Sequence, residues 1–308
     1  MTNGKWFDLQ GHRGARWFWP ENTLIGFQRA IEMGVDSIEL DVAVTRDGVV
    51  VVSHDPELNP EHTRDADGRF LVDRGARICT LNYADLQHYE VGQARPGSDY
   101  AARFPAQHAL DGERIPSLAD VFALTRKLEC HSLRFSIEVK TFPEQPDLTP
   151  SPERFVEVLL KAVVDARMAH RVTIMAFDWR VLSAVHRLAP QVATAALSDQ
   201  QVDDDTLWVD RAAASPWLGG LDARDFQGSV PRLIQASGAG QWGPHFLDLT
   251  GDAVAGAHAL GLKVIPWTVN ELPDIEHMLS LGVDGMISDR PDKIRAVLSA
   301  HGSHLNAR

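Results

Sequence analysis

The feature that most constrains the fold is an alternation, along the chain, between short apolar runs and longer helical patterns. The short runs are rich in β-branched residues, which favour strands, and they lie at Phe7–Gly11, Ser37–Thr45, Val49–Ser53, Arg134–Val139, Val172–Ala176, Val192–Leu197, Lys263–Trp267 and Gly285–Ser288. The helical patterns lie at Thr23–Met33, Leu118–Leu128, Pro152–Ala166, Val181–Leu188, Ala253–Leu260, Leu272–Leu281 and Lys293–Ala300. This βα rhythm predicts a parallel sheet covered by helices.

The number of βα units predicts that the sheet closes into a (β/α)8 TIM-type barrel. A chain of 308 residues suits one such barrel, so we expect a single domain over residues 1–308. An open doubly wound sheet is the alternative, and it is disfavoured because no glycine-rich dinucleotide loop follows the first strand. Residues 205–250 show no clear strand pattern.

Two segments interrupt the alternation. Residues 55–115 hold turn-forming pairs such as Asp67-Gly68 and Pro96-Gly97 without a sustained period, which indicates a small inserted subdomain after the second barrel strand. The proline-rich stretch Phe142–Pro152 follows a later strand. Loops that leave the carboxyl ends of barrel strands build the active face, so both segments are expected to shape substrate access.

The composition excludes several classes of function. A formal net charge of −12 argues against nucleic acid as a partner, so a small substrate is expected, and a phosphate would need local positive charge. No stretch approaches the roughly 18–20 apolar residues that cross a bilayer, which predicts no stable membrane insertion. A cytoplasmic location is expected, or a periplasmic or secreted one if a leader has been removed. Cys79 and Cys130 have no metal-binding or redox spacing.

The strongest local signal is the pair of acids in Ile38-Glu39-Leu40-Asp41-Val42. Side chains alternate along a strand, so Glu39 and Asp41 share one face. Two buried carboxylates side by side are costly unless a cation joins them, and oxygen ligands favour hard divalent ions, either Mg²⁺ or Ca²⁺. For an isolated pair of this kind, an amphipathic strand with one wet face is the more common explanation.

The hairpin that follows strengthens the metal interpretation. Thr45-Arg46-Asp47-Gly48 is a turn signal, and the returning strand brings His54 opposite Leu40 or Asp41. We expect its acidic neighbours to favour protonated His54, which suits it to donate a proton to a leaving alkoxide.

Two further strands end in residues that suit a phosphate site. His12 and Arg13 lie between glycines at the end of the first strand, where a histidine can act on a substrate and an arginine can bind a phosphate. Glu138 and Lys140 share a face of a later strand. They form either an internal salt bridge or a third metal carboxylate beside a phosphate-binding cation.

The ordered series of motifs resembles the glycerophosphodiester phosphodiesterase family. The matching segments are His12–Ala15, Pro20–Thr23, Gly34–Asp36, Glu39–Asp41, Thr45–Gly48, His54-Asp55, Ile137–Lys140, Trp267–Asn270, Gly282–Gly285 and Ser288–Pro291. The resemblance spans nearly the whole chain, and the ordered series is far more specific than any single motif.

The resemblance implies a barrel enzyme that hydrolyses small-molecule glycerophosphodiesters to glycerol 3-phosphate and an alcohol. Each implied role belongs to residues that match the family's motifs: the metal ligands are Glu39, Asp41 and Glu138, the general acid/base pair is His12 and His54, and the phosphate or substrate contacts are Arg13, Lys140, Trp267 and Asn22. Asp289 also matches a family position, but the adjacent Arg290-Pro291 favours a helix-start role. The number of subunits is left open.

One departure from the family pattern leaves the substrate class open. The loop Arg16-Trp17-Phe18-Trp19 is unusually aromatic, which favours an apolar wall for the alcohol half of the substrate, or a lipid-facing or subunit-facing patch. Two alternatives therefore remain: a phospholipase-D-like cleavage of lysophospholipid or sphingomyelin head groups, and a barrel that binds phosphodiesters without cleaving them.

Overall fold

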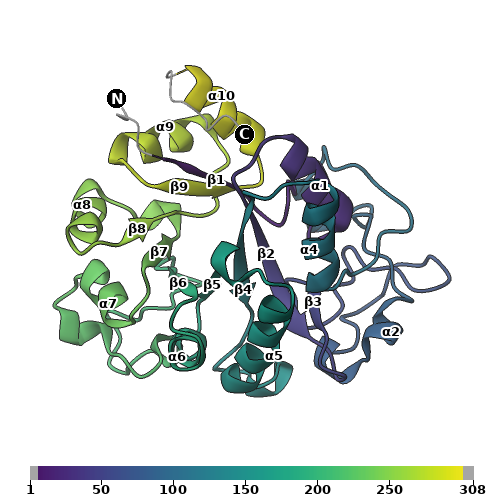
Figure 1. Cartoon of the computed structure of the whole chain (residues 1–308), viewed down its shortest axis with the longest axis horizontal. Helices are drawn as coiled ribbons and strands as arrows, with labels where there is room; N and C mark the ends of the chain where they lie inside the picture. Colours follow the sequence, from purple (N-terminus) through teal and green to yellow (C-terminus); the bar gives the residue numbers. More distant parts are fainter. Residues whose placement is uncertain (1–5, 301–308) are drawn as a thin grey trace.

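The computed structural model describes residues 6–300, so both ends of the predicted domain, residues 1–5 and 301–308, lie outside the described part. Its parallel strands form a nearly closed barrel with helices around it (Figure 1). In the order of the sheet the strands are β8 (Lys263–Val264), β7 (Gln241–Pro244), β6 (Ala193–Ser198), β5 (Val172–Ala176), β4 (Arg134–Val139), β2 (Ser37–Val44), β1 (Asp8–Gly11) and β9 (Gly285–Ser288). The predicted TIM-type barrel is confirmed.

Hydrogen bonds between the segments around β8 and β9 bring the two ends of the sheet together. The Asp284 N–H donates to the Val264 carbonyl at 2.8 Å, and the Ile287 N–H donates to the Pro266 carbonyl at 2.9 Å. As a result β9, the last strand, lies beside both β1 and the chain that follows β8. Residues near the two ends of the sequence therefore meet at one point of the rim.

The helices begin where the sequence provides caps. They are α1 (Leu24–Glu32), α2 (Tyr83–Leu86), α3 (Asp99–Arg103), α4 (Leu118–Lys127), α5 (Pro152–Asp165), α6 (Trp179–Leu188), α7 (Val230–Ala236), α8 (Gly251–Ala259), α9 (Leu272–Leu281) and α10 (Pro291–Ala300). Thr23 caps α1 by accepting from the Gly26 N–H, and Ser117 caps α4 in a capping box with Asp120. No helix within residues 6–300 is long and apolar enough to cross a membrane.

Two elements differ from the sequence-based expectation. β7 lies in residues 205–250, where no strand was expected, because Gln241-Trp242-Gly243-Pro244 contains no β-branched residue and two residues that weaken strands. β8 ends at Val264 instead of Trp267, since Pro266 has no N–H to donate to a neighbouring strand. Tertiary pairing in the barrel, rather than local propensity, fixes both elements.

The irregular segment that follows the hairpin of β2 and β3 (Val50–Val52) has its own small core. Leu58, Ile78, Leu86, Val91 and Ile115 pack there against Ala43 and Val51 on the outer face of the hairpin. The short helices α2 and α3 belong to this segment. Its apolar residues therefore anchor it to the barrel, and its status as a separate subdomain stays a prediction.

Candidate active site

The carboxyl end of β1 turns sharply and presents His12 and Arg13 to the barrel rim. A Cβ at Gly11 would lie 2.2 Å from the Gly14 carbonyl oxygen, so only glycine fits there. Arg13 has φ of 50°, in the left-handed region that non-glycine residues rarely adopt. The Arg13 N–H donates to Glu39 Oε2 at 2.9 Å, which ties this turn to the neighbouring strand β2.

His12 is oriented by a carboxylate from the far end of the sequence. Its Nδ1 lies 2.7 Å from Asp289 Oδ1, just after β9, while its Nε2 lies 3.9 Å from Glu39 Oε2. Asp289 also accepts from Arg16 Nε (2.9 Å) and from Asn270 Nδ2 (2.9 Å). The expectation that Asp289 mainly starts a helix is therefore wrong, because its carboxylate faces the histidine and two other side chains.

Burial and the charges around His12 keep it neutral near pH 7. Burial and the Arg16 guanidinium lower the pKa of His12, Asp289 opposes both effects, and the resulting pKa is about 4. Burial alone would raise the pKa of Asp289, but the adjacent Arg16 and His12 hold it far below its usual value. Asp289 is therefore an anion that fixes the imidazole with Nε2 toward Glu39.

Glu39, Asp41 and Glu138 form one buried cluster. Glu39 and Asp41 point from the same face of β2, as predicted, and Asp41 is the register partner of Glu138 on β4. One oxygen from each carboxylate lies within 4.8 Å of the other two. Their exposed fractions are only 1%, 0% and 7%, so three acids share a site with little access to water.

The pKa values of the three acids shift in different directions. Burial and the neighbouring Asp41 charge raise the pKa of Glu39 well above its usual value, and burial raises the pKa of Glu138 to about 7. Burial would raise the pKa of Asp41 as well, but Lys140 and Arg13 outweigh it and hold this pKa well below normal. The cluster thus combines one firm anion, Asp41, with two carboxyls whose raised pKa values mean that a bound cation must displace their protons.

Two basic side chains lie against this cluster. Lys140 Nζ lies 2.5 Å from Glu138 Oε1 and 3.2 Å from Asp41 Oδ1, while Arg13 Nε lies 3.2 Å from Asp41 Oδ2. Asn22, whose φ of 56° is also left-handed, donates from Nδ2 to Asp41 Oδ2 at 3.0 Å. Arg13 and Asn22 both have a positive φ, and both contact Asp41. Backbone strain of this kind is typical of functional sites.

These residues fit a hard divalent cation. The donor set consists of carboxylate oxygens, the kind that Mg²⁺ and Ca²⁺ prefer. Asp41 Oδ1 is buried and forms an ion pair with Lys140 but accepts no hydrogen bond within the described chain, so it retains capacity for a ligand. A second group with suitable spacing, Asp199, His245 and Asp248, lies across the barrel after β6 and β7.

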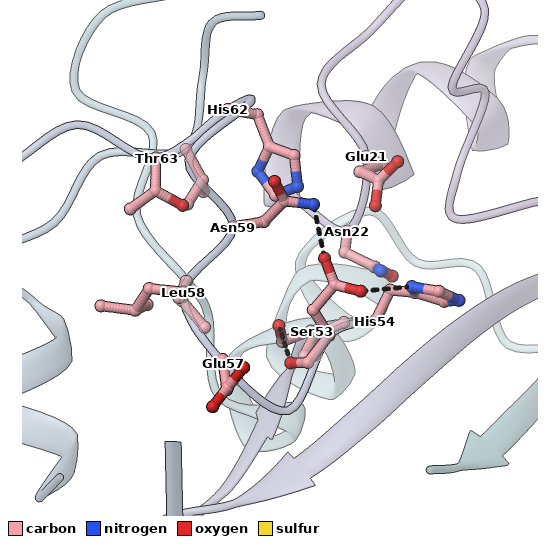
Figure 2. Close-up of a pocket in the computed structure, with 13 residues that line it drawn as sticks. Glu21, Asn22, Ser53, His54, Glu57, Leu58, Asn59, His62 and Thr63 are labelled. Carbon is pink, nitrogen blue, oxygen red and sulfur yellow. Dashed lines mark hydrogen bonds and ion pairs between the residues drawn. The ribbon is translucent and has the colours of Figure 1, made fainter. Parts of the chain in front are cut away.

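His54 follows β3 and has a carboxylate partner of its own. Its Nδ1 lies 3.1 Å from Asp55 Oδ1, and Asn59 Nδ2 donates to Asp55 Oδ2 at 2.5 Å, as the dashed lines in Figure 2 show. Behind this pair lies a cavity of about 20 Å³ that Glu21 and His62 also line. That volume is enough for about one water molecule.

The expected protonation of His54 is wrong. Burial and the Arg13 and Lys140 charges lower its pKa, Asp41 and Asp55 oppose them, and the resulting pKa is about 4. The effect of the Arg13 and Lys140 cations on this pKa exceeds that of the acids. Strand alternation alone could not predict that these cations lie near His54. At neutral pH both histidines are therefore unprotonated in the absence of a substrate.

Sequence reasoning missed Glu21, which organises the two arginines. Arg13 Nη1 donates to Glu21 Oε1 at 2.9 Å, and Arg16 Nη1 lies 3.4 Å from Glu21 Oε2. Tyr100, in α3 of the irregular segment, donates its hydroxyl to the same Oε2 at 2.9 Å. The one available signal was the position of Glu21 within Pro20–Thr23, a stretch that also reads as a turn and helix start.

The two histidines and the acids Glu39 and Glu138 line a cavity of about 580 Å³. His12, His54, Glu39, Glu138 and Lys140 line one side, and the other side is lined by Phe177, Asp199, Trp217 and Trp267. Trp267 is held by its indole N–H, which donates to the Gly243 carbonyl at 2.9 Å. The cavity is large enough for a small diester whose two halves contact different walls.

The aromatic loop does not form the expected wall. Among the described residues that line the cavity, only Arg16 comes from the loop Arg16–Trp19. Trp17 packs edge-on against Phe104, and Trp19 stacks on His108, both in the irregular segment. The aromatic side chains therefore fasten that segment to the β1 turn, and the proposal that they contact the alcohol half of the substrate is wrong.

Comparison with known proteins agrees with this geometry. Residues 12–293 match the model of the glycerophosphoryl diester phosphodiesterase family. A glycerophosphodiester phosphodiesterase of Caldanaerobacter subterraneus subsp. tengcongensis is 29% identical over 283 residues, which cover 92% of this chain and 94% of the relative.

Solved structures show the same architecture. A Silicibacter pomeroyi DSS-3 protein provisionally described as a glycerophosphoryl diester phosphodiesterase superposes with a TM-score of 0.84 at 34% identity, covering 97% of this chain and 95% of its own. An Oleispira antarctica phosphodiesterase, solved with the product sn-glycerol-3-phosphate, has a TM-score of 0.68 at 20% identity and covers 95% and 96% of the two chains. The chain therefore belongs to the glycerophosphoryl diester phosphodiesterase family of enzymes.

Proposed function

We propose that this enzyme hydrolyses glycerophosphodiesters in a metal-dependent reaction with His12 and His54 as its acid/base pair. The observation that carries the proposal is that both histidines, each with Nδ1 beside a carboxylate, line the same cavity as the buried acids Glu39 and Glu138. The products are glycerol 3-phosphate and an alcohol.

Glu39, Asp41 and Glu138 would hold one divalent ion, Mg²⁺ or Ca²⁺, through carboxylate oxygens. When bound, the ion supplies positive charge that stabilises the phosphate oxygens as negative charge builds on them. Arg13 and Lys140 lie at the same cluster, so their side chains bind the remaining phosphate oxygens by charge-assisted hydrogen bonds. Asn22 fixes the Asp41 carboxylate in place.

The two imidazoles move the protons. One neutral histidine accepts a proton from the attacking hydroxyl, and the other, once protonated, gives a proton to the departing alkoxide, which leaves the first protonated and the second neutral. In the cyclic route the second step reverses the two roles and restores both histidines, and after direct attack by water proton exchange with solvent restores them. The negative phosphodiester raises the pKa of an adjacent imidazole, which allows one of them to carry a proton when substrate is bound. The attacking hydroxyl belongs either to water or to the glycerol moiety, through a cyclic phosphate that water then opens.

The proposal is tested with purified enzyme and glycerophosphocholine. Glycerol 3-phosphate should appear in the presence of Mg²⁺ or Ca²⁺, and a chelator should abolish its release. Phosphocholine among the products would mean cleavage of the wrong P–O bond. Micellar lysophospholipid serves as the comparison, since faster turnover of that substrate would favour the phospholipase-D-like alternative. Tight binding of the diester without turnover under any metal would contradict the proposed hydrolysis.

A further inference from the structure

A cluster of metal-ligating side chains lies at the carboxyl ends of β6 and β7, apart from the carboxylates of the reaction centre. One ring nitrogen of His245 and one carboxylate oxygen each of Asp199 and Asp248 lie within 4.8 Å of one another. Of these three residues only Asp199 lines the cavity of the reaction centre. The cluster therefore lies mostly outside that cavity, between two neighbouring loops.

Strand pairing and one tight turn bring the three side chains together. β6 and β7 are adjacent parallel strands (Figure 1), with Ser198 in register with Pro244. The His245 N–H donates to the Ser198 carbonyl at 2.9 Å, and the Asp248 N–H donates to the His245 carbonyl at 3.0 Å. Asp199 and His245 thus directly follow paired strands, which hold a site more precisely than a free loop does.

Hydrogen bonds from the loop after β6 orient both carboxylates. The Gln201 N–H donates to Asp199 Oδ1 at 2.7 Å, and Gln201 Nε2 donates to Asp248 Oδ1 at 2.5 Å. The Gln200 N–H donates to Asp248 Oδ2 at 2.9 Å. Outer hydrogen bonds of this kind hold metal-ligating carboxylates in place. Asp199 Oδ2 accepts no hydrogen bond from any residue in the range 6–300, so it retains capacity for a ligand.

No lysine or arginine compensates these two carboxylates. The acids of the reaction centre lie against Arg13 and Lys140, whereas no basic side chain within residues 6–300 forms an ion pair with Asp199 or Asp248. Asp199 is only 5% exposed, and the Nδ1 atom of His245 is buried without a hydrogen-bond partner among the described residues. Such an arrangement is unfavourable unless a positive ion joins the three groups.

We propose that Asp199, His245 and Asp248 form a second metal site, which binds a transition-metal ion of the zinc type (Zn²⁺, Co²⁺ or Ni²⁺). An imidazole nitrogen beside two carboxylates suits these ions, whereas Mg²⁺ and Ca²⁺ favour oxygen ligands alone, as at the reaction centre. The bound ion connects the loop after β6 to the turn after β7. This site is independent of the proposed function, since no step of that reaction uses it.

The test counts zinc in the full-length enzyme. The protein is stripped with a chelator, equilibrated with Zn²⁺ in a large excess of Mg²⁺ that keeps the reaction centre occupied, and freed of unbound zinc by gel filtration. Elemental analysis should then find one zinc per chain in the wild type. Glu39→Gln, which alters the reaction centre, should retain the same zinc.

Three single variants remove one ligand each. Gln201→Ala, which removes only a donor to Asp248, should raise the Kd for Zn²⁺ about 10–100-fold, as for other outer-shell partners. Asp199→Asn, Asp248→Asn and His245→Gln should each raise it further and lose the zinc during gel filtration. The two asparagine substitutions preserve side-chain shape, so they report on the site even where His245→Gln folds poorly.

His277→Gln is the matched control, because His277 is an exposed histidine outside the cluster. It should retain the zinc. Thermal unfolding gives a second readout, since an ion that binds only the folded state raises Tm. Added Zn²⁺ should raise the Tm of the wild type, of Glu39→Gln and of His277→Gln, and leave that of the three ligand variants unchanged.

X-ray absorption at the zinc edge of the wild type should show one imidazole together with oxygen ligands, at about 2.0–2.2 Å. Zinc that persists at one per chain in all three ligand variants overturns the proposed site. Loss of the zinc in Glu39→Gln also overturns it, because that metal would belong to the reaction centre. Failure of the wild type to retain zinc has the same consequence.

Discussion

The two halves of the barrel rim are built in different ways. Around β1, β2, β4 and β9, each charged side chain of the reaction centre has at least one close partner, and Asp41 alone is contacted by Arg13, Asn22 and Lys140. Around β5 to β8, the cavity is lined by aromatic rings and by acids such as Asp203 that form no ion pair within residues 6–300. A densely connected network fixes geometry for the chemical step, whereas a sparse wall can change its contacts without disturbing that step.

The largest expected effect is on the half of the rim around β1, β2, β4 and β9, which we call the connected half. His12→Ala and His54→Ala should each lower kcat by about 10²–10⁴-fold, because each removes one member of the proposed acid/base pair. Initial rates of glycerol 3-phosphate release measure the effect. His131→Ala changes an exposed histidine far from the cavity lining and is the control. Full activity of either site variant would remove that histidine from the chemistry.

Asp289→Asn should lower kcat by about 10–10²-fold, as for other partners that orient a functional side chain. The Asp289 charge raises the pKa of His12, so its removal should lower that pKa and move the acidic limb of the kcat/KM profile to lower pH. The pH profile separates orientation from simple loss of fold. An unchanged profile with reduced stability would mean that Asp289 has only a structural role.

Metal binding at the connected half should depend on pH. In the metal-free protein the pKa of Glu138 is about 7, so below about pH 7 this carboxyl holds a proton that a cation must displace, and the pKa of Glu39 is raised in the same direction. Affinity should therefore fall as pH falls, by about tenfold per pH unit for each displaced proton.

Calorimetry at pH 6 and pH 8, in buffers of different protonation enthalpy, counts the released protons. Glu138→Gln should bind the metal more weakly and release about one proton fewer. A metal affinity that is equal at both pH values would contradict the assigned ligands.

The smallest expected effect tests how far the connected network extends. Tyr100→Phe removes the hydroxyl that donates to Glu21, and it should lower the free energy of unfolding by about 1 kcal/mol with a few-fold loss of kcat. Urea denaturation and initial rates measure both. Tyr89→Phe is the control, since the Tyr89 hydroxyl makes no hydrogen bond within the described residues. Equal results for the two variants would place the boundary of the network at Glu21.

The sequence predicts features that depend on local periodicity. Strand alternation places Glu39 and Asp41 on one face, and the hairpin brings His54 beside them, as the hydrogen bond from the Ser53 N–H to the Asp41 carbonyl at 3.0 Å shows. The barrel follows from the repeated βα rhythm. These inferences need only the two-residue period of a strand and the rules for short turns.

Contacts that depend on barrel closure could not be predicted in the same way. His12 and Asp289 are 277 residues apart, and they meet because β9 pairs with β1. Periodicity does not specify which side chains face each other across that junction. The low pKa of His54 was missed for a related reason, because it depends on Arg13 and Lys140, which reach the site from different strands.

The bond between Tyr100 and Glu21 has a consequence for protein engineering. The irregular segment around α3 is attached to the same carboxylate that holds Arg13 and Arg16. A chimaera that receives this segment from a relative would also exchange a support of its own arginines. Grafts should therefore preserve a hydroxyl donor at this junction, and shortening the segment would produce a barrel with misaligned guanidinium groups rather than a minimal enzyme.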